Sequence, residues 1–161
     1  MTAAAASSDA SQPLRGSLSR LLAAGLAGGA VDFVYASAMA LSRGNPPTRP
    51  WRMVASGWIG RDAAEGAFPV ALGVVTHFGI ALCMAAAYIH LALRVPVVAA
   101  RPWATAPAYG LILYAVMYLG VLPLRFGNPW QWRGALSILD ILAHIGVALA
   151  IVAVATRRRP Q

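Results

Sequence analysis

The sequence predicts an all-α integral membrane protein: a bundle of four transmembrane helices plus a short amphipathic interfacial helix. Hydrophobic residues make up 59% of the 161 residues, and charged residues only 11%. Soluble domains carry roughly 25% charged residues, so 13 basic and 5 acidic side chains are too few for a soluble surface. The mean hydropathy of +0.64 supports the same class. The length excludes a large multi-domain enzyme.

Four apolar stretches of about 20 residues or more divide the chain, each long enough to cross a hydrocarbon core about 30 Å thick as a helix. Helices are expected because unpaired backbone groups cannot face lipid. Residues 1–17 lack periodicity and predict a disordered N-terminal tail, and residues 157–161 form a basic C-terminal tail. Residues 18–156 are therefore one transmembrane domain. Its expected spans are about 18–42, 68–92, 104–124 and 134–156.

The first stretch also has features of a cleaved signal peptide. Arg15 and Arg20 precede an apolar run, and Ala36-Ser37-Ala38 resembles a cleavage site. Glycines and Asp32 interrupt the apolar region, which favours a retained first span.

The loop after the first span predicts a short helix over about 49–62. Asn45-Pro46-Pro47 ends the first helix, and Thr48 can cap the next one, with Pro50 in its first turn. Its apolar residues recur at helical spacing, as expected for a helix lying at the membrane interface with its indoles at headgroup level. A loop helix packed on the mouth of the bundle is the alternative. The apolar face comprises Trp51, Val54, Ala55, Trp58 and Ile59.

All 13 basic residues are arginine, and they fall between the apolar stretches. This distribution is typical of membrane-flanking charge and argues against nucleic-acid binding. The side that holds the N-terminus carries seven arginines and the other side six, if four spans are counted. The cluster Arg157-Arg158-Arg159 favours a cytoplasmic position for both termini.

Small residues recur on the predicted contact faces of the spans. Gly25 and Gly29 form a GxxxG motif, which lets a second helix approach closely. Gly73 and Gly110 are expected to have the same packing role in the second and third spans. Besides the lipid bilayer, the partner of the Gly25/Gly29 face could be a second copy or another subunit of a larger membrane complex.

Polar residues inside the spans define a candidate site. Asp32, His77 and His144 each lie about nine residues from the same end of their spans, which places them about 13 Å deep. Tyr114 and Tyr118 bracket that level in the third span. We define these five residues as the polar layer. Arg125 and Asp140 lie nearer the mouth and are expected to form an ion pair there.

The polar layer allows four interpretations. The favoured one is interhelical hydrogen bonding in a non-enzymatic protein without a cofactor, worth about 1 kcal/mol per contact. The second is a site that binds or transports a proton, an ion or a small polar ligand, because a buried Asp and a buried His can exchange a proton near neutral pH. The third is a metal site of Asp32, His77 and His144, as an intramembrane hydrolase with zinc-bound water would need. The fourth is b-type haem held by His77 and His144. No catalytic triad, P-loop or Rossmann motif is present in the sequence.

A series of short segments from Gly73 to about Val152, about half of the chain, has a characteristic order and spacing. The segments are Gly73-Val74-Val75-Thr76-His77, Ala87-Tyr88, Tyr109-Gly110, Leu122-Pro123-Leu124, Trp130 and Ala143-His144-Ile145-Gly146. In these segments the chain resembles the YagU-like family of bacterial inner-membrane proteins. The resemblance implies a small multi-pass protein of a bacterial inner membrane, with histidines in two of its spans and no catalytic residue.

Overall fold

The computed structural model describes residues 12–62, 65–127 and 129–157, and over these ranges the chain forms helices and no strand. Four helical segments are long and apolar enough to cross a membrane, and they confirm the predicted all-α four-helix membrane bundle. They are Leu18–Ser42, Ala67–Arg94, Pro102–Phe126 and Ala135–Ala155.

The ends of the last three spans lie within two residues of their predicted positions. The first helix begins at Gln12, inside the predicted tail, where Pro13 suits a first helical turn because its ring fixes φ and it has no N–H to leave unpaired. The helices along the chain are α1 Gln12–Ser42, α2 Arg49–Ile59, α3 Ala67–Arg94, α4 Pro96–Ala100, α5 Pro102–Ala115, the π-helix Val116–Val121, α6 Leu122–Phe126 and α7 Ala135–Ala155.

The third span is not a uniform α-helix, because α5 and α6 flank a π-helical segment. Pro123 has no N–H to pair with the carbonyl of Leu119, so a wider turn before the proline redistributes the backbone hydrogen bonds. The span then ends at Gly127, whose left-handed conformation (φ 67°) glycine adopts without a steric penalty.

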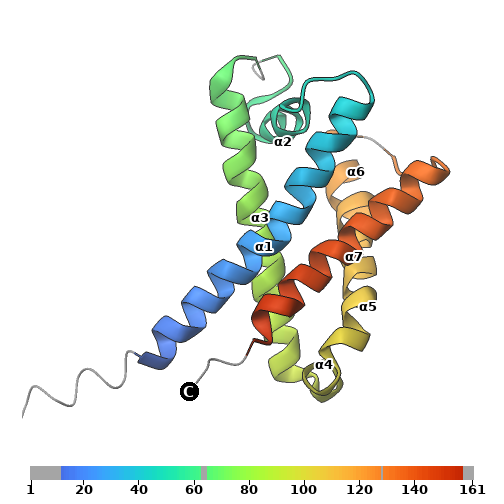
Figure 1. Cartoon of the computed structure of the whole chain (residues 1–161). Coiled ribbons are helices and arrows are strands. Elements are labelled where there is room, and N and C mark those ends of the chain that lie inside the picture. Colours follow the sequence, from blue (N-terminus) through green and yellow to red (C-terminus); the bar gives the residue numbers. More distant parts are fainter. Residues whose placement is uncertain (1–11, 63–64, 128, 158–161) are drawn as a thin grey trace, which may run out of the picture.

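α1 lies between α3 and α7, and α5 packs on the other side of α7 (Figure 1). Glycines lie at these contacts. Gly25 faces Leu82 of α3, Gly28 faces Ile151 of α7, and Gly110 faces the backbone of α7. Each allows a close approach that a methyl group would block, as is usual where membrane helices pack.

The bundle is closed at the α4 end and open at the α2 end. Near α4, Tyr88 and Tyr109 pack with their ring centres 5.3 Å apart, and the Tyr109 hydroxyl donates to the Met84 carbonyl at 2.6 Å. The buried apolar core is also in this half and includes Ala85, Leu113 and Val152. Towards the other end α3 and α6 diverge, and α2 lies across the space between them (Figure 1).

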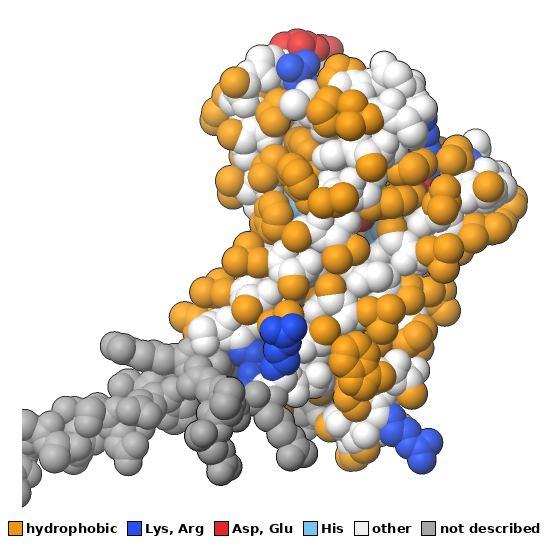
Figure 2. Space-filling model, viewed as in Figure 1, with side chains coloured by type: hydrophobic (Ala, Val, Ile, Leu, Met, Phe, Trp, Pro, Cys, Tyr) orange, Lys and Arg blue, Asp and Glu red, His pale blue; other side chains and the backbone are white. Residues whose placement is uncertain are grey.

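The outer surface of the bundle is apolar, as lipid contact requires. Leu26, Val75 and Leu119 are among the large hydrophobic residues exposed on different spans. Figure 2 shows apolar side chains over most of the visible body, with arginine side chains towards its ends. The Gly25/Gly29 face is covered by α3 of the same chain, so in this structure it does not present a surface to a second copy.

α2 packs on the mouth of the bundle, which is the alternative that the sequence left open. Trp51 is only 3% exposed, so its indole contacts other residues of the chain and is not on the outer surface. The indole stacks on Phe33 of α1 with the ring centres 4.4 Å apart, and such aromatic pairs are stabilised beyond the area that they bury. Trp58 is exposed, as predicted for an interfacial indole, and Thr48 makes no capping side-chain bond.

Candidate functional site

A cavity of about 1540 Å³ lies beneath α2, in the space where the spans diverge. α1, α3, the π-helix with α6, and α7 form its walls. Of the polar layer, Asp32, His77, Tyr118 and His144 line this cavity. Tyr114 belongs to the same layer and packs behind Tyr118, with their ring centres 4.6 Å apart.

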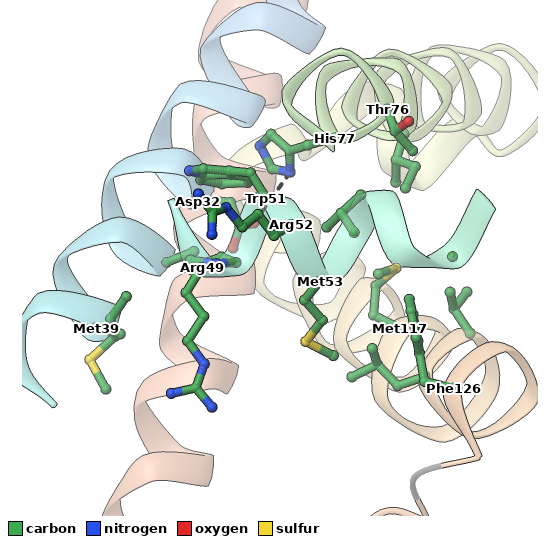
Figure 3. Close-up of a pocket in the computed structure, with 18 of the residues that line it drawn as sticks. Asp32, Met39, Arg49, Trp51, Arg52, Met53, Thr76, His77, Met117 and Phe126 are labelled. Atoms are coloured by element: carbon green, nitrogen blue, oxygen red, sulfur yellow. Dashed lines mark ion pairs between the residues drawn. The ribbon is translucent and has the colours of Figure 1, made fainter. Parts of the chain in front are cut away.

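Asp32 and His77 form a pair between α1 and α3. The Asp32 Oδ2 atom is 3.7 Å from His77 Nδ1, and the other ring nitrogen, Nε2, is 2.9 Å from the Gly29 carbonyl oxygen. A hydrogen bond to that carbonyl needs the proton on Nε2, so Nδ1 can donate to the carboxylate only in the imidazolium form of the ring. The Trp51 ring lies 4.9 Å from the imidazole and covers the pair from α2 (Figure 3).

Asp140 is the centre of a second polar cluster, between α1 and α7. It is 5% exposed, accepts a hydrogen bond from the Tyr35 hydroxyl at 2.6 Å, and pairs with the Arg133 guanidinium at 2.5 Å. Because both carboxylate oxygens have a partner, the buried charge is compensated. The Asp140 backbone carbonyl lies 2.8 Å from His144 Nδ1, which fixes the orientation of that ring.

Aromatic rings of the third span enclose His144. Tyr114 and Tyr118 meet its imidazole edge-on at 5.7 Å and 5.8 Å. The Tyr114 hydroxyl accepts a hydrogen bond from the Trp130 indole at 2.9 Å, which ties the loop before α7 to the span.

The polar layer is therefore two clusters that share one cavity. Asp32 pairs with His77, whereas Tyr114, Tyr118 and His144 gather near Asp140. The reason is the central position of α1, which presents Asp32 to α3 and Tyr35, three residues further on, to α7.

The predicted mouth ion pair is wrong in one partner. Asp140 pairs with Arg133, and Arg125 donates instead to the Gly57 carbonyl of α2. Arg133 lies in the short connection before α7 and reaches the carboxylate from there, and its backbone N–H also bonds Ser137 Oγ at 2.9 Å. Arg125 lies at the end of the third span, next to α2, which forms the roof of the cavity.

The proposed metal ligands are not brought together. Asp32 and His77 are adjacent, but His144 belongs to the other cluster, and within 12–62, 65–127 and 129–157 no three His, Cys, Asp or Glu side chains converge on one point. The same separation puts the two histidines of the haem hypothesis in different clusters. The metal hypothesis therefore has no ligand set among the described residues, whereas the haem hypothesis needs two histidines only and stays a prediction.

Three important residues were not predicted as part of the site. Tyr35 lies one turn after Asp32, and that spacing is the signal that could have placed it near the layer. Arg133 precedes Asp140 by seven residues and takes the position at the carboxylate that was expected of Arg125. Trp51 was assigned to the interface, although its aromatic ring is equally suited to covering a buried pair.

Comparisons of the chain with family models, with curated proteins and with solved structures found no match. The resemblance to the YagU-like family stays a prediction.

Proposed function

We propose that this multi-pass membrane protein is a non-enzymatic protein of a bacterial inner membrane that binds a small ligand with a polar group in the cavity beneath α2. The observation that carries the proposal is the shared cavity: residues of both polar clusters line one space of about 1540 Å³. Ligand sites are commonly concave, mostly apolar spaces of this kind with a few polar groups.

Interhelical hydrogen bonding remains part of the proposal. The bond between Tyr35 and Asp140 joins α1 to α7, and the bond between His77 and the Gly29 carbonyl joins α3 to α1. These contacts account for helix packing, but packing alone does not need a large space beside them. A ligand site uses both features, because rigid helices hold the polar groups in place.

The test is the access of water to the cavity. Met117 lines the cavity and Leu119, in the same π-helix, is exposed on the apolar surface. Cysteine is placed at either position in a background in which the single native cysteine, Cys83, is replaced by alanine. A charged, membrane-impermeant thiol reagent is expected to modify Met117→Cys quickly and Leu119→Cys slowly, because the reagent and the thiolate both need water.

Equal, slow modification at both positions would contradict the proposal and favour a closed bundle held by interhelical bonds. The same measurement addresses orientation. We place the termini in the cytoplasm, so the cavity opens to the periplasm and the reagent should reach Met117→Cys in intact cells. Modification only in inverted vesicles would reverse that orientation.

A further inference from the structure

Arginine is the dominant charged residue around the cavity. Six arginines and three carboxylates line it, so with neutral histidines the lining carries a formal charge of +3. The arginines are Arg43, Arg49, Arg52, Arg61, Arg125 and Arg133, and the carboxylates are Asp32, Glu65 and Asp140.

The carboxylates compensate only part of this charge. Asp140 is paired with Arg133 and Glu65 with Arg52, at 2.5 Å and 3.2 Å respectively. Asp32 lies beside His77, deeper in the span than the rim of the cavity. Among the described residues, no salt bridge joins a carboxylate of the lining to any of the other four arginines.

Three of those four arginines donate hydrogen bonds to neutral groups. For the fourth, Arg43, the structure records no side-chain hydrogen bond or salt bridge among the described residues. Arg61 donates to the Phe126 carbonyl at 3.2 Å, Arg125 donates to the Gly57 carbonyl, and Arg49 donates to the Asn45 side chain. Carbonyl and amide oxygens accept a hydrogen bond without neutralising the guanidinium. The positive charge of the rim is thus available to an anion.

One arginine atom also lacks a partner where it should have one. Arg52 Nε is buried beside the cavity and makes no hydrogen bond. A buried donor without an acceptor costs free energy, about 1 to 3 kcal/mol in protein mutational data. The guanidinium of Arg52 is already held by Glu65 and its Nε atom is closed to a ligand, so the anion site is assigned to the other arginines. Figure 3 shows the Arg49 side chain extending away from the Asp32–His77 pair.

Apolar side chains also line the cavity, among them Met39, Met53, Val121, Leu122 and Phe126. We propose that the cavity binds a phosphate-bearing ligand, with its oxyanion among the rim arginines and any acyl chain along the apolar wall. Guanidinium groups match phosphate oxygens in geometry and charge. This inference rests on the proposed function and names the ligand class for the same cavity.

The test uses the full chain in a neutral detergent and measures the thermal unfolding midpoint while a probe is added at constant ionic strength. The probes are dioctanoyl phosphatidylglycerol, its phosphate-free counterpart dioctanoylglycerol, and sodium phosphate. The variant Arg43→Gln/Arg49→Gln removes two exposed charges from the rim. The matched control, Arg94→Gln/Arg101→Gln, removes two exposed charges at the α4 end.

We expect phosphatidylglycerol to stabilise the parent and the control equally, and to bind the rim variant roughly tenfold or more weakly, as loss of charge-assisted contacts implies. Dioctanoylglycerol should have no such effect. Stabilisation by sodium phosphate, lost in the same variant, would support a phosphate site with a soluble ligand.

Equal binding by parent and rim variant would overturn the inference, as would the absence of binding by both phosphate probes. Without a probe, both double variants should unfold at the parent temperature, which separates loss of binding from loss of fold. If the thiol at Met117→Cys reacts quickly but no phosphate probe binds, the phosphate inference fails while the proposed cavity function stands. If the thiol at Met117→Cys reacts slowly, the phosphate inference and the proposed cavity function both fail.

Discussion

The contact between α2 and α3 depends on Gly73 and gives the most direct test of the roof of the cavity. A Cβ atom at this position would collide with the backbone carbonyl of Trp51. The obstacle is a main-chain group, so a rotamer change cannot relieve the collision. We therefore expect Gly73→Ala to push α2 away from α3 and to destabilise the protein.

Gly79 in the same helix is the matched control, because a Cβ atom there meets nothing within 4 Å. Both substitutions replace glycine with alanine inside a helix, which by itself favours the helix by about 1 kcal/mol. That gain cancels in the comparison. The remaining difference is the overpacking cost, about 1 to 3 kcal/mol or more.

Thermal unfolding in detergent measures this difference. At roughly 2–4 °C per kcal/mol, the figure for soluble domains of comparable size, Gly73→Ala should unfold about 2 to 12 °C below Gly79→Ala. The hydrogen bond from the Trp58 indole to Thr76, 3.0 Å long, also joins α2 to α3 and should weaken with it. Equal midpoints for the two alanine variants would refute the close contact of α2 with Gly73.

Three further changes test the packing and the Asp140 cluster. Gly110→Ala places a methyl group against the backbone of α7 and should lower the thermal unfolding midpoint. An unchanged midpoint would show that α5 and α7 do not pack this closely. Arg133→Gln and Asp140→Asn should show a coupling of about 1 kcal/mol in a double-mutant cycle of unfolding free energies, and additive effects would show that the two do not interact. Trp130→Phe removes the hydrogen-bond donor to the Tyr114 hydroxyl and should lower the free energy of unfolding in denaturant by about 1 kcal/mol. An unchanged free energy would show that water takes the place of the indole N–H.

The positions of the spans could be predicted because hydrophobic length is a property of the local sequence. A span needs about 20 apolar residues wherever it lies in the bundle, and the loops supply the charges. The short helix after the first span was also predictable from its periodicity. Its environment was not, because Trp51 suits both an interface and a buried contact with Phe33.

The candidate site could be predicted only in part. Depth along a helix follows from residue number, so Asp32 and His77 were correctly expected at one level, and the structure places them together. Which residues meet across helices depends on helix order and rotation, which a single sequence does not fix. Tyr35 and Asp140 are 105 residues apart, and no periodicity links them.

The π-helix in the third span has a consequence for how related sequences should be compared. A π-turn holds one more residue than an α-turn, so residues after it are rotated by about 100° relative to an uninterrupted helix. A helical wheel drawn through Val116–Val121 therefore misplaces the residues beyond it, including Arg125, which reaches the Gly57 carbonyl of α2. A homologue with an uninterrupted α-helix here should align only with a one-residue gap inside this span, although gaps within membrane helices are normally penalised.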